Sequence, residues 1–148
     1  MGDQKTDPME VDAVLEGLDA ALALQLRSAI AYTAIGGGLT GVAFHGLAAD
    51  LREWAHAELE DARHLIEKVA TLGGTPSVDP APVELRDEPR EALQWLIAAE
   101  VECIDALHAV IPHTGQEGRS EALEHRLEHL IMRKQEQVDT LVRVCAGQ

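Results

Sequence analysis

The sequence predicts an all-α protein that folds as a bundle of four helices, and three observations lead to this expectation. Apolar residues make up 46% of the chain but aromatic residues only 3%, and this Ala- and Leu-rich mixture favours closely packed helices over a sheet. In four segments the apolar residues recur at steps of three and four. Short connections join the segments into two pairs, and one long connection joins the pairs, which is a known connectivity of helical bundles.

The first pair of helices is expected over about residues 8–35 and 41–72. The motif DPME at residues 7–10 is typical of a helix start, because Asp can cap the helix, Pro suits its first position and Glu can close a capping box. Three consecutive glycines, Gly36–Gly38, are expected to end the first helix. The pair Gly73-Gly74 is a plausible C-cap of the second helix.

The segment Thr75–Glu88 contains three prolines and has no helical period, so it is expected to be the long crossover. The third helix is expected over about residues 89–111, where Pro112 ends it, and the fourth over about 119–145. At 148 residues the chain is expected to form a single domain, residues 1–148.

Charge and composition narrow the classes of partner. The formal net charge of −14 disfavours nucleic-acid binding and favours metal cations or a basic protein partner. The N-terminal residues lack the apolar core of a signal peptide, and no segment approaches the length of a membrane span. The two cysteines are expected to be free thiols. We therefore expect a soluble cytoplasmic protein that binds no membrane.

A polar residue interrupts the apolar face of each predicted helix near its middle. The interruptions are Gln25 in the first helix, Glu58 and Asp61 in the second, Glu100 in the third, and Lys134 and Gln137 in the fourth. In a bundle of four roughly equal helices, these residues are expected to meet at one level. Unpaired buried charges cost several kcal/mol or more, so the carboxylates need a metal, a cationic partner, protons or an internal water pocket.

The segment ELEDARHLIEKVATLGGTP, residues 58–76, resembles the second-helix segment of bacterioferritins and its exit from the helix. The resemblance extends over about residues 15–144 and implies a ferritin-like, iron-associated protein. Members of that family hold two irons with a Glu on the first helix, E-x-x-H on the second, a Glu on the third and E-x-x-H on the fourth.

By this resemblance, only Glu58 and Glu100 keep the ligand types of the family. Asp61 stands in place of a histidine and can still ligate a metal, whereas Gln25 is a weak neutral ligand. The remaining two positions hold Lys134, which cannot ligate while protonated, and Gln137, another weak ligand. The position at which a bacterioferritin offers a methionine to haem holds Leu59, so we expect no haem.

Three states of the polar layer stay open at this point. In the first, Lys134 replaces the metal and pairs with Glu58, Asp61 and Glu100. In the second, these three carboxylates hold one divalent ion, for which iron(II), manganese(II) or magnesium suits oxygen ligands. In the third, a two-iron centre is intact. The functional hypotheses follow: an iron-associated protein with a degenerate oxidation centre, an active ferroxidase that stores iron, or a non-catalytic interaction or cargo module.

Two further features bear on assembly and on surface metals. The pairs His56/His64 and His125/His129 lie on helix faces that point away from the polar layer, where a solvated surface or a metal site is conceivable. The family resemblance implies a homodimer or larger homo-oligomer that pairs through the first two helices. The sequence has no short fifth helix of the kind that bacterioferritins use to build a cage, so a 24-subunit shell is not expected.

Overall fold

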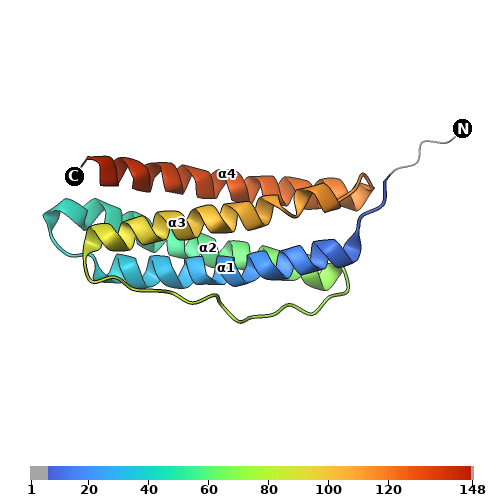
Figure 1. Cartoon of the computed structure of the whole chain (residues 1–148), viewed down its shortest axis with the longest axis horizontal. Coiled ribbons are helices and arrows are strands. Elements are labelled where there is room, and N and C mark those ends of the chain that lie inside the picture. The colour runs from blue at the N-terminus through green and yellow to red at the C-terminus, as the bar shows by residue number, and fades with distance from the viewer. Residues whose placement is uncertain (1–6, 148) are drawn as a thin grey trace, which may run out of the picture.

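The computed structural model describes residues 7–147, and in this part of the chain all regular structure is helical (Figure 1). The four long helices are α1 (Val11–Gly38), α2 (His45–Thr71), α3 (Pro89–His108) and α4 (Gly118–Ala146). Two single-turn 3₁₀ helices, η1 (Val42–Phe44) and η2 (Ile111–His113), precede α2 and α4. The prediction of an all-α four-helix bundle is confirmed.

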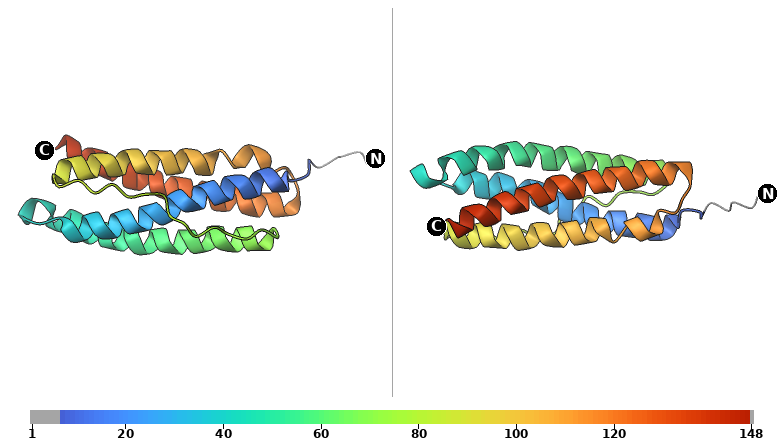
Figure 2. Two further views of the ribbon diagram at one scale, coloured as in Figure 1. Left: turned by 60° about the horizontal axis from the view of Figure 1, so that its bottom comes forward. Right: turned by 90° about the horizontal axis from the view of Figure 1, so that it is seen from above.

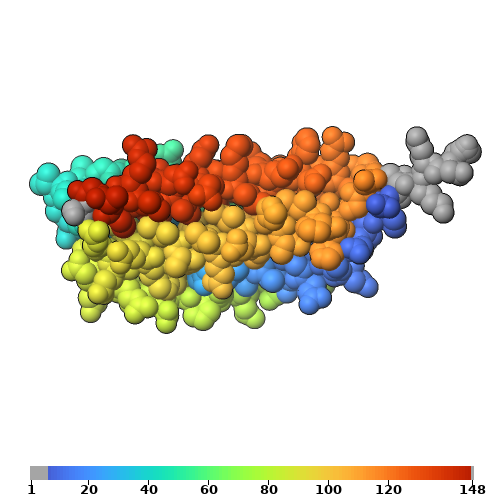
Figure 3. Space-filling view, turned by 45° about the horizontal axis from the view of Figure 1, so that its top comes forward, coloured from blue at the N-terminus to red at the C-terminus, as the bar shows by residue number. Residues whose placement is uncertain are grey.

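The chain runs up, down, down and up through the bundle (Figures 1 and 2). The helices α1 and α2 form one antiparallel hairpin, and α3 and α4, which lie side by side over one face of the molecule (Figure 3), form the other. The crossover between α2 and α3 returns along the whole length of the bundle, on the side of α1 that faces away from α4. It is attached to α1 where the Ala81 amide donates to the Ala23 carbonyl (2.9 Å) and the Ser77 amide donates to the Asp19 carboxylate (2.9 Å).

The core consists of two apolar clusters that lie on either side of a polar layer. One cluster lies at the end of the bundle where α1 begins; its fully buried leucines are Leu18, Leu22, Leu65, Leu107, Leu127 and Leu130. The other lies at the opposite end and is built around Tyr32, Leu51, Leu93, Leu96 and Leu141. Burying each such side chain contributes about 1.5–3 kcal/mol. Both clusters receive residues from all four helices, so the polar layer lies between two apolar regions that span the whole cross-section of the bundle.

The predicted start and end of the first helix were wrong by three residues each. Residues 7–10 are not helical, and Glu10 is the N-cap without a capping side chain. Their backbone is used elsewhere: the Glu10 amide donates to the His113 carbonyl (3.0 Å) and the Gln116 amide donates to the Asp7 carbonyl (2.8 Å). At the other end α1 continues through the three glycines. A Cβ at Gly36 would lie 3.0 Å from the Leu51 Cβ, so glycine here permits close packing of α1 on α2.

The other boundaries differ less. The helix α2 begins at His45, four residues later than predicted, because the 3₁₀ turn η1 comes first. The helix α3 ends at His108 and not at residue 111, because the chain turns before η2, which contains Pro112. The helix α4 extends one residue beyond each predicted end. The helix α3 begins with Pro89 in its first turn and has Glu88 as its N-cap.

Gly115 is expected to be intolerant of substitution. It has a φ of +72°, and an added Cβ would lie 2.6 Å from the backbone of Pro8. We predict that Gly115→Ala lowers the free energy of unfolding by more than about 1 kcal/mol, since Ala at a positive φ is strained even without the clash. Gly37→Ala is the matched control, because this helical glycine has open space around it, and we expect it to be neutral or to stabilise by about 0.5 kcal/mol. Urea titration followed by circular dichroism measures both; equal midpoints would contradict the prediction.

Candidate functional site

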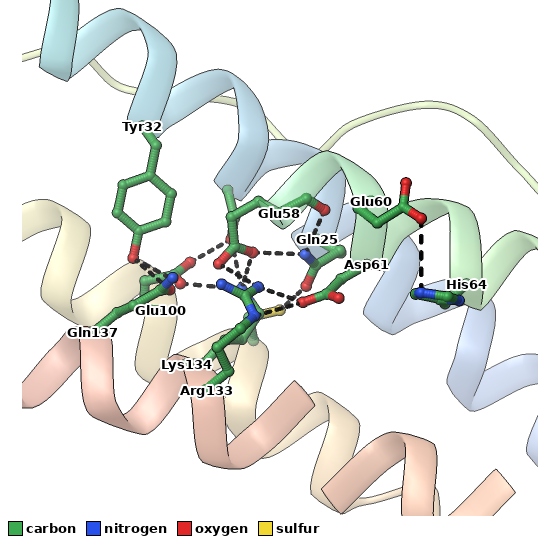
Figure 4. A network of polar contacts seen from close by, with 12 residues as sticks. Gln25, Tyr32, Glu58, Glu60, Asp61, His64, Glu100, Arg133, Lys134 and Gln137 are labelled. Carbon is green, nitrogen blue, oxygen red and sulfur yellow. Dashed lines mark hydrogen bonds and ion pairs between the residues drawn. The ribbon is translucent and has the colours of Figure 1, made fainter. Parts of the chain in front are cut away.

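The polar layer lies at the centre of the bundle, where the predicted residues of all four helices come together (Figure 4). Four of them have no solvent exposure at all: Gln25, Glu58, Glu100 and Lys134. Asp61 is 7% exposed and Gln137 is 3% exposed. The structure thus places three carboxylates and one ammonium in the interior of an otherwise apolar bundle.

The Lys134 ammonium lies between two carboxylates from different helices. Its Nζ donates to Glu58 Oε2 on α2 (2.5 Å), to Glu100 Oε2 on α3 (3.0 Å) and to Ser28 Oγ on α1 (3.3 Å). These contacts use all three donors of the ammonium. Burial lowers the pKa of Lys134, but the charges of Glu100 and Glu58 outweigh it, so the net pKa lies above its ordinary value. The lysine is therefore charged at neutral pH.

Glu58 receives hydrogen bonds from several elements at once. Gln25 Nε2 on α1 donates to Oε2 of Glu58 (2.6 Å) and also to its backbone carbonyl (2.8 Å). Gln137 on α4 donates to Oε1 (2.8 Å) when its amide is oriented to satisfy both of its neighbours, and it then accepts from Arg133 Nη1 (2.5 Å). Burial raises the pKa of Glu58, Glu100 raises it further, and Lys134 and Arg133 act in the opposite direction without cancelling the rise.

Glu100 is held by hydroxyl groups of α1 in addition to the lysine. The Ser28 hydroxyl donates to Oε1, and the Tyr32 hydroxyl donates to Oε2 (3.0 Å). Burial raises the pKa of Tyr32 well above its ordinary value, and the neighbouring Glu100 adds to this rise. The Tyr32 ring packs edge-on against Trp54, with 5.8 Å between the ring centroids. Both side chains are thus part of the packing around the layer.

The predicted pairing of Asp61 with Lys134 was wrong, because Asp61 pairs with Arg133. Arg133 Nε donates to Asp61 Oδ2 (2.9 Å), and its Nη2 contacts the same oxygen and Glu58 Oε1 (3.1 Å). Asp61 lies nearly one turn beyond Glu58 on α2, and Arg133 reaches it from the flank of α4. The Arg133 side chain is 22% exposed, so the network extends from the bundle centre to the edge of the α2–α4 contact.

Arg133 was not among the predicted site residues, since only positions on the apolar stripe of the fourth helix were expected to face the bundle centre. Arg133 lies beside that stripe, and its long side chain carries the guanidinium inward. The available signal was the charge count, since three carboxylates faced a single ammonium. With Arg133 the layer holds three carboxylates and two cations, which leaves one formal negative charge among the hydroxyl and amide donors.

The other predicted metal candidates lie outside this layer. His64 lies 3.9 Å from Glu60 and 3.7 Å from Glu67 on the outer side of α2, away from the network (Figure 4). His125 lies 3.8 Å from Glu121 on the surface of α4. Across residues 7–147, no group of three or more His, Cys, Asp or Glu side chains is arranged to hold a metal ion.

The sequence of residues 15–146 matches the ferritin-like domain family, which covers most of the chain. The protein therefore belongs to the ferritin-like family. No protein with a curated description matches the sequence significantly.

Solved structures with the same fold include a diiron-carboxylate protein, a bacterioferritin and a dodecameric thioferritin. The chain is 26% identical to a ferritin-like, diiron-carboxylate protein from Bacillus anthracis, with a TM-score of 0.85 over 91% of this chain and 96% of the other. A bacterioferritin from Rhodobacter capsulatus, solved with a metal-free dinuclear site and haem iron, is 24% identical (TM-score 0.78; 88% and 81% covered). The dodecameric thioferritin from Bacteroides fragilis, a bacterioferritin-related protein, is 16% identical (TM-score 0.82; 94% and 88% covered). The last two likenesses concern the fold alone.

The residues of the polar layer do not fit the two-metal centre that a diiron-carboxylate relative implies. Glu58 and Glu100 are the two residues that would hold metals by their type, but Lys134 Nζ lies against Oε2 of both of them. A further cation, the Arg133 guanidinium, occupies the outer oxygen of Glu58 and the carboxylate of Asp61. The layer contains no imidazole, and its two amide side chains are weak ligands. The positive charge that metals would supply is already provided by side chains.

Removing the buried ammonium is expected to destabilise the protein in a pH-dependent way. Lys134→Met leaves Glu100 without a cation, and we predict a loss of about 3–5 kcal/mol in the free energy of unfolding at pH 7. Burial already raises the pKa of Glu58, and loss of the Lys134 charge raises it further, so the stability of the variant falls as the pH rises above the unfolded value of about 4.3. The deficit relative to the wild type should therefore shrink as the pH is lowered from 7 towards 4.5.

The control for this experiment is Lys68→Met, which removes a lysine near the surface and should change stability by no more than about 0.5 kcal/mol. Urea denaturation at a series of pH values gives all three curves. In the wild type, Lys134 itself stays charged below its unfolded pKa of 10.5, so any change in the deficit between pH 7 and 4.5 comes from protonation of the carboxyl groups. A Lys134→Met deficit that does not vary with pH would refute the ion-network description.

Tyr32, the single tyrosine of the chain, reports the same environment optically. Because its pKa is raised in the folded state, we predict that the phenolate absorbance near 295 nm stays flat as the pH passes 10. At higher pH the absorbance should rise together with the loss of helical circular dichroism. The reason is that the unfolded chain can ionise Tyr32 from about pH 10 and the folded chain cannot, so the free energy of unfolding falls as the pH increases. The urea-unfolded chain, which should titrate near pH 10, is the reference. Ionisation of the folded protein near pH 10 would show that the hydroxyl is not buried against Glu100.

Proposed function

We propose that this protein is an iron-related, ferritin-like protein whose oxidation centre is degenerate, because an internal network of Lys134, Arg133 and three carboxylates takes the place of the metals. It does not act as a ferroxidase. Its role is that of a structural or regulatory relative of the iron-storage proteins. The observation that carries the proposal is the position of Lys134 Nζ, between Glu58 Oε2 (2.5 Å) and Glu100 Oε2 (3.0 Å) in a fully buried site.

Electrostatics support this proposal over one weak divalent ion held by Glu58, Asp61 and Glu100. A divalent ion at this place would lie next to two fixed cations. Expelling Lys134 would require a route to solvent for an ammonium that is 0% exposed, and the two apolar clusters close the bundle on both sides of it. Deprotonating it is also unfavourable, since its carboxylate neighbours raise its pKa. A bound metal would thus have to displace contacts that already satisfy its ligands.

The assembly and surroundings of the protein are proposed by analogy with its relatives. Bacterioferritin and a dodecameric thioferritin are among the structures with this fold, and we propose a homodimer or larger homo-oligomer. None of the helices within residues 7–147 is long and apolar enough to cross a lipid bilayer. We also propose a cytoplasmic location and no haem, the latter because Leu59 offers no ligand.

Restoring the ligand set of the family tests the proposal directly. The variant Gln25→Glu, Asp61→His, Lys134→Glu, Gln137→His places carboxylate and imidazole groups where the metal-binding relatives are expected to have them. We predict that it binds roughly two Fe(II) ions per chain in anaerobic calorimetry. The wild-type protein should show no stoichiometric binding and no rapid oxidation of Fe(II) under air.

Adding Glu58→Gln and Glu100→Gln to the restored variant is the matched control. It separates the central site from nonspecific adsorption of iron on the acidic surface, and it should abolish the stoichiometric binding. Rapid oxidation of two irons per chain by the wild-type protein would overturn the proposal in favour of an active ferroxidase. Thermal unfolding of every variant establishes that the bundle is intact before iron is added.

A further inference from the structure

A second polar feature lies on the surface, where α2 and α4 run side by side (Figure 2, right). An open pocket of about 600 Å³ is present there, towards the end of α2 and the beginning of α4. Its lining consists of His64, Glu67, Lys68, Ala70, Thr71 and Arg126. The pocket is separate from the buried network: its α2 residues begin three positions after Asp61, and its α4 residue lies two helical turns before Arg133.

The pocket collects positive charge in a strongly acidic protein. The chain has 12 Lys and Arg residues against 26 Asp and Glu, yet two basic side chains and a histidine converge here. On α4, Arg126 is the middle member of a set spaced by seven residues with Arg119 and Arg133. Arg119 pairs with Glu117 (2.8 Å), and Arg133 pairs with Glu58 and Asp61. Among the described residues, neither Arg126 nor Lys68 has a carboxylate oxygen within 4.0 Å of its side-chain nitrogens.

The acidic residues near the pocket have other partners. Glu67, the one acid in the lining, accepts a hydrogen bond from Arg63 Nη1 (2.5 Å) on the solvent side of α2. Glu60 is paired with the same arginine. The acids of the first half of α4, at positions 121, 124 and 128, lie on the opposite arc of that helix by its 3.6-residue period. The pocket therefore keeps two cations without a carboxylate partner. Lys68 lies in the last turn of α2, where a cation interacts favourably with the helix dipole, but Arg126 has no such explanation.

We propose that this pocket is a binding site for a phosphate-type oxyanion. Arg126 supplies a planar fork of N–H donors, Lys68 a point charge and Thr71 a hydroxyl to the lining of the pocket. The ring nitrogens of His64 face Glu60 (3.9 Å) and Glu67 (3.7 Å), so His64 is not counted among the donors. A guanidinium, an ammonium and a hydroxyl around one pocket match an anion with several oxygens better than the two oxygens of a single carboxylate. The volume accommodates inorganic phosphate, pyrophosphate or the phosphate end of a small phosphomonoester. The shared chemistry is the dianionic phosphate group.

Titration of the full-length protein with three probes tests the proposal and distinguishes the sources of the phosphate group. Inorganic phosphate, pyrophosphate and glycerol 3-phosphate are added separately at low ionic strength, and binding is followed by calorimetry and by the NMR signals of the His64 ring. We expect saturable binding of at least one probe, with the tightest probe identifying the source. The double variant Lys68→Gln, Arg126→Gln should weaken its affinity at least tenfold.

The matched control is Arg119→Gln, which removes an arginine from the same helix whose charge is already paired, and it should leave the affinity within about twofold. Circular dichroism establishes that each variant is folded. The proposal is overturned if no probe binds saturably, or if the double variant binds as well as the wild type. It is also overturned if ultracentrifugation shows that the double variant loses a wild-type oligomer, since the pocket would then be a contact between copies of the chain.

Discussion

The arrangement of this bundle depends on one buried ammonium shared between two carboxylates. Lys134 on α4 pairs with Glu58 on α2 and Glu100 on α3, and Ser28 on α1 completes its hydrogen bonds. All four helices therefore contribute to the surroundings of a single charge. An axial shift of any helix by one residue would separate a donor from its acceptor by 1.5 Å and rotate it away by about 100°. The network is satisfied in one register only.

The two apolar clusters and the polar layer have different roles in the fold. Burial of leucines in the clusters supplies the driving force for helix association, and this force is largely indifferent to the exact alignment of the helices. The polar layer determines the axial register of the helices, because each of its hydrogen bonds has a required geometry. The same residues give the layer its own counter-charges: the ammonium pairs with Glu58 and Glu100, and the guanidinium pairs with Glu58 and Asp61. Two of the three carboxylate charges in the layer are thus balanced by cationic side chains of the same chain.

Much of the fold and the centre of the site could be predicted from the sequence. Apolar periodicity located the four helices, and the mid-helix polar residues indicated a common level, at which Gln25, Glu58, Glu100 and Lys134 lie. Helix ends were less predictable, because local rules compete with packing. The glycines after Ile35 remain helical where α1 packs closely on α2, and the expected capping residues at 7–10 instead bond to the turn before α4.

The part of the site that could not be predicted concerns side-chain reach. Periodicity places a Cα on a face of a helix, but it does not say where the end of a long side chain lies. Arg133 starts beside the apolar stripe of α4, yet its guanidinium contacts Asp61 and Glu58. For this reason Asp61 was assigned to the wrong cation. A count of charges could have shown that a second cation was needed, but only coordinates show which one.

The long crossover has a consequence for how the two hairpins recognise each other. In the layer, the hairpin α1–α2 contributes the carboxylates Glu58 and Asp61 and no cation. The hairpin α3–α4 contributes both cations, Lys134 and Arg133, with one carboxylate, Glu100. The two halves are therefore opposite in sign at their mating surfaces, −2 against +1. If a protease cut the exposed crossover, the fragments would retain complementary faces, and reassembly would not depend on the peptide that links them.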